Sequence, residues 1–421
     1  MYISVFLWYY ISMKRILITF ISFFAAMTVF SQDMSFFKTE YMTTDGTFAE
    51  RRAVLENVRN GGFTGIGDFY HEALQYFLLV IPNVKTSTER ADAEISAIIL
   101  CQGLAAEKYT AAAPELWQLA ELYDASRAGN NGNVMQAALV AIGQVNGTDF
   151  VPHISQGLAN FNAQIQITSG VENRTKIQTA VRGCISALEA LKDIRGYRSV
   201  FFASIGTYEI PVKQMASNAL PNIVEDPSDV LIEIIRDVSG DPNVKIAAYR
   251  EIFRTKAPDS SKAKVASAAL ESGWSYSTPN RNFQGILRTM RKEAIGAIGV
   301  YGAADPSIYI NLEKSYSNNF ISRDPDNDEV AAALNALTAL KTDEAVGLLY
   351  KFLLELNGRR RNGPWGNKER RYFEWIVGCI GKTGTQSSDV RYLLTTISSN
   401  ANYTGQEQTM ARNAMTSLGF R

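Results

Sequence analysis

The pattern of apolar and polar residues predicts two successive helices between Asn131 and Leu158. In the first, apolar side chains recur at helical spacing from Val134 to Val145, which places them on one face of an α-helix. Gly147 interrupts the pattern, and a second helical pattern follows it. The same arrangement recurs along the chain at intervals of about forty residues, so we expect a stack of helix pairs.

A recurring residue at the end of each apolar phrase sets the period, which is about forty to forty-one residues. These marker residues are Gly103, Gly143, Gly299, Lys341, Gly381 and Gly419. The residue two before each marker is small: Cys101, Ala141, Ala297, Ala339, Cys379 and Ser417. The residue five before it is apolar: Ile98, Ala138, Ala294, Ala336, Ile376 and Ala414. Small residues at a fixed place on a helix let a neighbouring helix approach closely, as a stacked array requires.

The repeated phrase resembles the HEAT repeat of armadillo-type α-solenoids, including the variant first described in phycobilisome lyases. In that family a second helix ends in an alanine-rich phrase with glycine, and a turn with Asp or Pro leads into the next unit. The matching residues are Ala138 to Gly143 with Asp149 and Pro152, Ala294 to Gly299 with Asp305 and Pro306, and Trp375 to Gly381. The resemblance covers most of residues 50–421 and implies an α-solenoid. It implies no function, and no residues match a lyase site.

The middle of the chain departs from this spacing and predicts shorter units. Its helical patterns cover Ile177 to Leu191, Val212 to Val224, Val230 to Val238, Val244 to Phe253 and Ala263 to Leu270. Two connections look longer than the others, Ser272 to Gly285 and Asn357 to Asn367, and both carry aromatic residues that we expect to be exposed. Because insertions in repeat proteins often carry binding surfaces, these connections are the first candidates for a contact with a partner.

The N-terminal region has the pattern of a secretory signal peptide. Lys14 and Arg15 precede an apolar run from Ile16 to Phe30, which is short for a membrane span. A membrane anchor is the alternative, because the residues before Met13 are also apolar, but the two cations interrupt that longer segment. Translation from Met13 is another alternative. We expect residues 1–31 to be cleaved and the mature protein to be exported, to a bacterial periplasm, without a lasting membrane span.

Composition narrows the possible partners. The 42 basic and 42 acidic residues of the 421-residue chain balance, so no global field favours nucleic acid or an anionic membrane. Only two histidines, His71 and His153, and three cysteines are present, and neither histidine has a companion at metal-ligand spacing. We therefore expect no metal and no cofactor. Cys101 and Cys379 occupy the small-residue position, and Cys184 lies in an apolar pattern, so we interpret all three as buried packing residues.

One cationic cluster with a tryptophan is the candidate partner-binding site. An anionic partner is attracted by such cations, and the indole ring offers a stacking or cation–π surface. The cluster consists of Arg359, Arg360, Arg361, Trp365, Lys368, Arg370 and Arg371, and Trp274 and Tyr276 of the other connection are added to it. A solvated loop followed by a helix start is the alternative interpretation.

Three short motifs point weakly to catalysis or ion binding. GCIGKT at 378–383 resembles the end of a P-loop but needs a glycine where Ile376 stands. SKAK at 261–264, SNN at 317–319 and KTG at 382–384 occur in the order used by penicillin-binding proteins, but that fold needs a sheet. Asp324, Asp326 and Asp328 alternate as in a calcium loop that is otherwise incomplete, so a helix cap before Val330 is favoured.

Taken together, the sequence predicts an all-α protein: a right-handed α-solenoid of about nine repeats and some twenty helices over residues 51–421, preceded by a leader or cap at 32–50. The expected function is a noncatalytic scaffold that presents a helical surface to protein partners in the cell envelope. A structural subunit of a periplasmic assembly and an enzyme with an unrecognised site are the alternatives. The sequence leaves the oligomeric state open.

Overall fold

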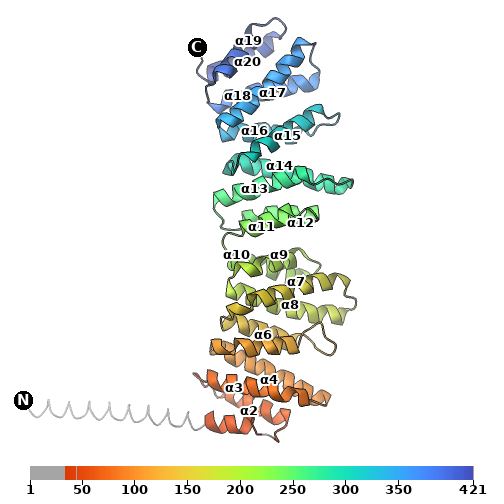
Figure 1. Ribbon diagram of the computed structural model, residues 1–421, viewed down its shortest axis with the longest axis vertical. Helices are drawn as coiled ribbons and strands as arrows, with labels where there is room; N and C mark the ends of the chain where they lie inside the picture. The colour runs from red at the N-terminus through yellow and green to blue at the C-terminus, as the bar shows by residue number, and fades with distance from the viewer. Residues whose placement is uncertain (1–33, 44, 421) are drawn as a thin grey trace, which may run out of the picture. The chain divides into compact units, whose positions relative to one another are not determined.

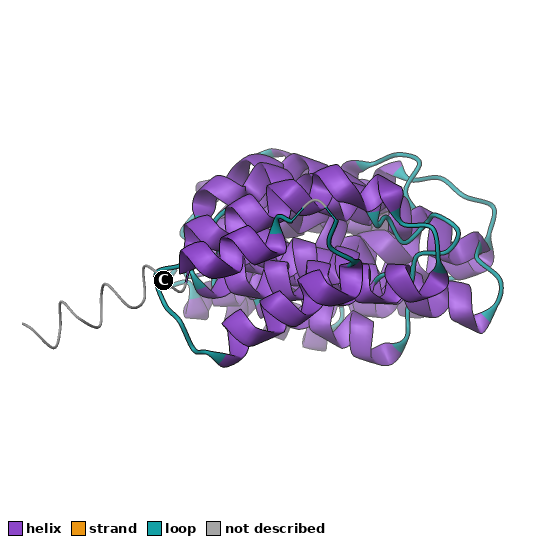
Figure 2. Cartoon of the chain, turned by 90° about the horizontal axis from the view of Figure 1, so that it is seen from below, coloured by secondary structure: helices purple, strands orange, loops and turns teal. Residues whose placement is uncertain are grey.

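The computed structural model describes residues 34–43 and 45–420, so the predicted signal peptide lies outside the described residues. Every regular element in these two ranges is a helix, and Figure 2 shows purple helices joined by teal loops, with no strand drawn. The helices form two compact units, the first ending at Val224 and the second beginning at Glu225. Within each unit, helix pairs follow one another in chain order (Figure 1).

Unit 1 begins, among the described residues, with a helix over residues 34–41. Its other helices are α2 (Phe48–Asn60), α3 (Gly67–Val80), α4 (Ser87–Ala106), α5 (Ala113–Leu122), α6 (Asn133–Gln144), α7 (Val151–Ile167), α8 (Val171–Leu191), α9 (Tyr197–Ile205) and α10 (Ile210–Ile223). Short 3-10 turns lie at Ile81–Asn83, Thr110–Ala112, Thr148–Phe150 and Ile194–Gly196. The expected leader at 32–50 is therefore partly helical, and α2 begins three residues before the predicted solenoid.

Unit 2 continues the series of helix pairs. Its helices are α11 (Ser228–Arg236), α12 (Pro242–Glu251), α13 (Asp259–Ser275), α14 (Arg281–Tyr301), α15 (Ser307–Ile321), α16 (Asn327–Leu340), α17 (Asp343–Arg361), α18 (Asn367–Thr383), α19 (Ser388–Ser399) and α20 (Gly405–Ser417), with a 3-10 turn at Ile252–Arg254. With the helix at residues 34–41 and α2 as the first pair, the described residues hold twenty α-helices in ten pairs, which confirms the predicted helix number and gives one more pair than the nine or so repeats expected. The fold is an α-solenoid.

Two layers of helices run through each unit. The even-numbered helices pack on one another in sequence and form what we call the even layer; the odd-numbered helices form the odd layer. The most extensive contacts within a layer are those of α6 with α8 and of α14 with α16 in the even layer, although some odd-layer pairs, such as α11 with α13, also pack closely. Close approach requires small residues at the contact, and the even helices carry the repeated glycines and alanines.

Three marker glycines do not end their helices, as the sequence pattern had suggested, but make the contact between even helices. Gly143, Gly299 and Gly381 each lie inside a helix. A β-carbon on Gly299 would lie 3.4 Å from Ala336 Cα, and one on Gly381 would lie 3.3 Å from Ala414 Cα. The alanine is in both cases the residue five before the next marker. The glycine and this alanine thus form a repeated contact pair.

The small-residue position two before the marker is buried in some repeats and exposed in others. Cys101 and Ala141 are each 1% exposed, and Ala297 and Cys379 are also buried. Ala339 and Ser417 are exposed, yet both lie at the contact between even helices, because a β-carbon on Gly299 would lie 3.9 Å from Ala339 Cβ and one on Gly381 would lie 3.8 Å from Ser417 Cβ. Small residues at this position therefore lie at the close helix contact, as predicted, even where their side chains are exposed.

A repeated side-chain hydrogen bond joins the two helices of a pair. The fourth residue of several even helices donates a hydrogen bond to a carbonyl at or after the end of the preceding helix, where carbonyls lack helical partners. These residues and acceptors are Arg51 to Thr43, Arg174 to Ile165 and Thr168, Lys245 to Ile235 and Asp237, Gln284 to Thr278, and Gln408 to Asn400. These long polar side chains stabilise the hairpins by capping them.

Candidate functional site

The predicted site around Trp365 is a packing junction and not an open surface. Trp365 is 7% exposed, and its indole N–H donates a hydrogen bond to the Leu356 carbonyl at 3.2 Å. Its ring packs against Phe373 and Tyr403, with centroids 4.9 and 5.5 Å away. The predicted long connection is also shorter, because α17 continues to Arg361. The expectation of an exposed tryptophan here is wrong.

Arg360 ties the last two helix pairs together. Its guanidinium lies over the Trp365 ring at 5.1 Å, and its Nε donates to the Asn402 carbonyl at 2.8 Å. It also lies 3.7 Å from the carboxylate of Glu407, whose side chain is 5% exposed. Arg370 approaches the same carboxylate at 3.8 Å. These two cations of the predicted cluster are therefore partnered within the protein.

The remaining cations of the cluster divide between packing and solvent. Lys368 donates to the carbonyls of Phe320 and Ser322, at 2.6 and 3.1 Å, and so caps the end of α15. Arg359 covers the Phe320 ring at 4.2 Å and pairs with a glutamate one turn earlier. Arg361 and Arg371 are exposed and make no ion pair with any residue in the described ranges.

Trp274 and Tyr276 also belong to internal contacts. The Trp274 indole N–H donates to Ser315 at 3.1 Å, and the Arg291 guanidinium lies 4.0 Å above the ring. Arg291 in turn forms a bidentate pair with Glu329, at 2.8 and 3.0 Å, and that glutamate is 1% exposed. Tyr276 faces the Lys245 ammonium at 5.5 Å. The connection between α13 and α14 covers only residues 276–280, shorter than predicted.

Open grooves occur instead between successive helices of the even layer. In unit 1 a groove of about 390 Å³ lies between α4 and α6, and in unit 2 grooves of about 550 and 330 Å³ lie between α12 and α14 and between α16 and α18. Each groove is lined by two neighbouring even helices alone. The two grooves of unit 2 both lie between successive even helices, so the even layer presents a surface that recurs with the repeat.

The α4–α6 groove carries no charge among its lining residues. They are Ile98, Cys101, Gln102, Ala105, Asn133, Gln136, Ala137, Val140, Ala141 and Gln144. Its floor is apolar, and its polar groups are amides, which both donate and accept hydrogen bonds. The α12–α14 groove differs, because Arg250 beside it is held by Glu293 of α14 at 2.9 Å.

The α16–α18 groove combines an aromatic ring with polar groups that have no internal partner. Its lining residues are Ala331, Leu334, Asn335, Glu374, Trp375, Gly378, Cys379 and Lys382. Trp375 is half-buried and stacks on Tyr372 of the same helix with centroids 5.7 Å apart. The side chains of Asn335, Glu374 and Lys382 make no hydrogen bond or ion pair with any other described residue. We therefore take this groove as the candidate site.

Sequence reasoning missed this groove. The sequence analysis selects Trp365, because its glycine- and asparagine-rich surroundings predict an exposed connection, and it treats Trp375 only as part of the repeat. The usable signal was helical spacing: Arg371, Trp375, Gly378 and Lys382 recur on one face of α18. A tryptophan between two cations on an exposed helix face is a more open site than one in a folded hairpin tip.

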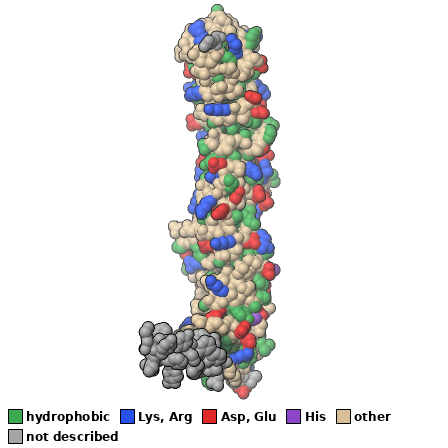
Figure 3. All heavy atoms as spheres, turned by 90° about the vertical axis from the view of Figure 1, so that its left-hand side faces the viewer, with side chains coloured by type: hydrophobic (Ala, Val, Ile, Leu, Met, Phe, Trp, Pro, Cys, Tyr) green, Lys and Arg blue, Asp and Glu red, His purple; other side chains and the backbone are tan. Residues whose placement is uncertain are grey.

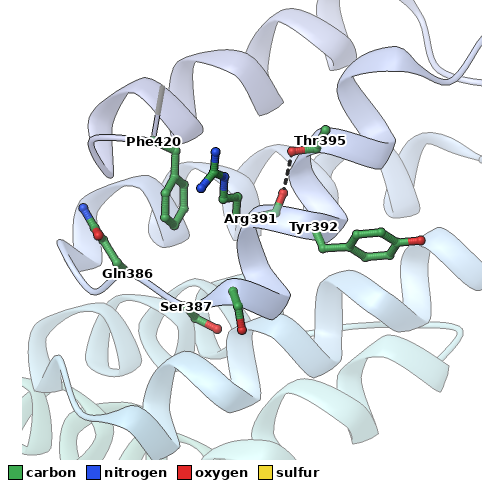
Figure 4. A pocket seen from close by; sticks show the side chains of 7 residues that line it. Gln386, Ser387, Arg391, Tyr392, Thr395 and Phe420 are labelled. Carbon is green, nitrogen blue, oxygen red and sulfur yellow. Dashed lines mark hydrogen bonds between the residues drawn. The ribbon is translucent and has the colours of Figure 1, made fainter.

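A further hollow of about 510 Å³ lies at the last hairpin and is drawn in Figure 4. Phe420 and Arg391 lie side by side there, with the guanidinium 5.6 Å from the ring centroid, while Tyr392 points away. Gln386 beside it donates to the Leu418 carbonyl at 3.0 Å. These contacts hold the C-terminal segment against α19.

The groups that the catalytic motifs would need are occupied elsewhere or buried. Ser261 donates to Asp226 at 2.6 Å, and Lys382 and Thr383 end a helix and not a strand. Burial raises the pKa of Cys184 to about 12 and raises the pKa of Cys101 and Cys379 as well. Asp326 caps α16 by accepting from two backbone N–H groups, as expected for the calcium-like stretch.

The described residues contain neither a metal-binding cluster nor a membrane-spanning helix. Over 34–43 and 45–420, no group of three or more His, Cys, Asp or Glu side chains is placed to hold a metal ion. In the same ranges, no helix combines the length and apolar character that crossing a membrane requires.

No family model matches the chain, and no curated protein matches it. Among solved structures it is similar to importin beta crystallised in a polyethylene glycol condition, with 12% identity, a TM-score of 0.33, and coverage of 92% of this chain and 54% of the other. It is also similar to importin beta in an ammonium sulfate condition, with 11% identity, a TM-score of 0.32, and coverage of 92% and 53%. The chain spans about half the length of these structures. Likeness at this level assigns no function.

Proposed function

We propose that this protein is a noncatalytic, exported scaffold that binds another protein of the cell envelope through its even layer. The observation that carries the proposal is the α16–α18 groove, where the half-buried ring of Trp375 lies beside three polar side chains that have no internal partner. Contacts within the protein occupy the other candidate residues except Arg361 and Arg371, which are exposed. Stacked repeats of this kind commonly use an extended helical surface for binding.

Charge supports a protein partner over a nucleic acid. The chain has no net charge, and on the face drawn in Figure 3 blue and red side chains intermingle. A nucleic-acid surface gathers cations in one patch or stripe, because phosphate contacts supply most of the affinity. The predicted cationic cluster does not form such a patch, since Arg360, Lys368 and Arg370 are engaged within the protein.

Site-specific photo-cross-linking in cells tests this function. A photoreactive amino acid at Asn335 on the even layer should give one dominant foreign protein adduct, whereas the same group at Gly347 on the odd layer should not. Both positions are exposed and lie inside helices of unit 2. Adducts between copies of this chain would instead identify a structural subunit of an assembly, and no adduct at Asn335 would contradict the proposal.

The proposed location needs its own measurement. N-terminal sequencing of the native protein should find a mature end near Gln32, and the protein should leave cells with the osmotic-shock fraction. A chain that starts at Met1 or Met13 and stays in the cytoplasm would contradict export while leaving the binding surface untouched.

A further inference from the structure

Four residues form a stripe along the open face of α18. Arg371, Trp375, Gly378 and Lys382 recur at helical spacing, so they point to the same side of the helix. Neither cation forms an ion pair with a described residue. The carboxylate of Glu374 lies beside Trp375 and is also unpartnered. The stripe and the adjoining Glu374 together present charges in the order positive, negative, positive around one indole ring.

Gly378 keeps the side of this ring open. A β-carbon there would meet no atom within 4 Å, so packing does not require a glycine at this position. Glycine is nevertheless one of the poorest helix formers, and it stands in the interior of α18. A side chain at 378 would fill the groove next to Trp375. The absence of one preserves space for a ligand against the helix backbone.

We propose that the α16–α18 groove binds an extended segment of the partner protein, anchored by one aromatic side chain against Trp375 and flanked on each side by an acidic residue. This inference rests on the proposed function and names the chemistry of the partner. The acidic residues pair with Arg371 and Lys382, and a backbone N–H beside the aromatic residue donates to Glu374. Asn335, across the groove on α16, supplies an amide to the partner backbone.

Helix geometry sets the spacing of the two acidic residues. Arg371 and Lys382 are eleven positions apart, which is about 16 Å along a helix at 1.5 Å per residue. An extended segment covers that distance in about five residues. The groove volume of about 330 Å³ is at the low end for ligand sites, which fits one large side chain with adjoining backbone.

The test uses the mature protein labelled with 5-fluorotryptophan and the hexapeptide Asp-Gly-Tyr-Ser-Gly-Asp. The fluorine resonance of Trp375, assigned by its loss in Trp375→Phe, should shift on titration with millimolar peptide, while those of Trp117, Trp274 and Trp365 should not. Replacing the peptide tyrosine with alanine, or both aspartates with lysine, should weaken binding by about tenfold or more.

Two matched variants separate binding from folding. Gly378→Leu fills the groove and should abolish the shift, whereas Gly347→Leu places the same side chain on an exposed interior position of α17, also with no atom within 4 Å, and should bind as the parent does. Both variants should melt at the parent temperature or slightly above it, because leucine is a better helix former than glycine. The proposal would be overturned if the Trp375 resonance did not move or if the lysine peptide bound as tightly as the aspartate peptide. It would also be overturned if chitotriose, a carbohydrate used as a ligand of another class, gave a larger shift than the peptide.

Failure of this anchoring mode can be distinguished from failure of the scaffold function. If photo-cross-linking at Asn335 captures a partner that Gly378→Leu still binds with parent affinity, the scaffold stands and this anchoring mode is wrong. If the peptide binds but no cellular partner is captured, the scaffold function is wrong while the groove chemistry holds.

Discussion

Gly143 lies so close to Ala187 of the next even helix that a β-carbon on the glycine would be 2.9 Å from the alanine Cα. Gly183 of α8 makes the reciprocal approach, with a β-carbon position 2.8 Å from Gln136 Cα. Because the obstruction is backbone, no side-chain rotation relieves it. This pair of contacts explains why α6 and α8 approach each other so closely.

Gly143→Ala should therefore destabilise unit 1, although alanine is the better helix former. Overpacking a contact of this kind costs about 1–3 kcal/mol, against a helix-propensity gain of up to about 1 kcal/mol. Urea unfolding followed by circular dichroism measures the difference. Gly378→Ala, where no atom lies within 4 Å, is the control and should be neutral or stabilising. Equal effects at both positions would contradict the close-contact role.

The buried pair of Arg291 and Glu329 makes a second prediction. Glu329→Ala leaves the guanidinium in a site where its side chain is only 12% exposed, and should cost about 3–5 kcal/mol. Replacing both partners, as Arg291→Met with Glu329→Leu, should cost less than the single change, because no unpaired charge remains. Fluorescence of Trp274, which Arg291 covers, reports the unfolding of this region. A double variant worse than Glu329→Ala would show that the pair itself is strongly stabilising.

The period and the fold class were predictable because the same physical requirement recurs in every unit. Each even helix must bury one stripe and let the next helix approach, so alanine and glycine return at fixed places in the sequence. The role of the marker was harder to predict. A glycine near the end of an apolar phrase, such as Gly299, reads equally as a helix end or as a close contact. Only the neighbour, Ala336, distinguishes the two.

The candidate site was not predictable from local pattern. Trp365 and Trp375 both stand near arginines. Trp365, however, is covered by Tyr403 of the following hairpin and by Arg360, whose side chain also pairs with that hairpin. The contact between Trp365 and Tyr403 joins residues thirty-eight positions apart. Composition around each tryptophan carries no information about such a contact. Helical spacing on α18 carried more, since it showed which residues share a face with Trp375.

Lys245 gives a prediction about pH. It is 1% exposed, and burial lowers its pKa below the ordinary value of 10.5, with the nearby Asp237 opposing the shift. Below the native pKa the lysine is protonated in both folded and unfolded chains, so its contribution does not change with pH. Between the native pKa and 10.5 the unfolded chain binds more protons, so stability attributable to this lysine rises with pH.

The free energy of unfolding of the parent protein should consequently rise relative to that of Lys245→Met as pH increases through this window. Lys245→Met should also be less stable at neutral pH, by about 1.5–3 kcal/mol, because the carbonyls of Ile235 and Asp237 lose a charged donor. The exposed Lys264→Met is the control and should show a flat difference. A difference that falls with rising pH would contradict the buried-lysine assignment.

The three cysteines should be unreactive in the native protein. Cys101 and Cys184 are each 1% exposed and Cys379 is 7% exposed, and burial raises the pKa of all three thiols. The thiolate is the reactive form, so a thiol-reactive disulfide reagent at pH 8 should label no cysteine until denaturant is added, and three afterwards. Rapid labelling of one thiol in the native state would show that its helix contact opens.

Arg360 and Arg361 separate packing from surface binding within the predicted cationic cluster. Arg360→Ser removes a guanidinium that is 10% exposed, bonded to the Asn402 carbonyl and placed over two aromatic rings, so it should destabilise the α19–α20 hairpin by about 1.5–3 kcal/mol. Arg361→Ser changes an exposed side chain and should stay within about 0.5 kcal/mol of the parent. Hydrogen exchange of amides in α20 measures the local effect. If both variants exchange as the parent does, Arg360 contributes nothing to the junction, and a role at the surface becomes the better explanation for its position.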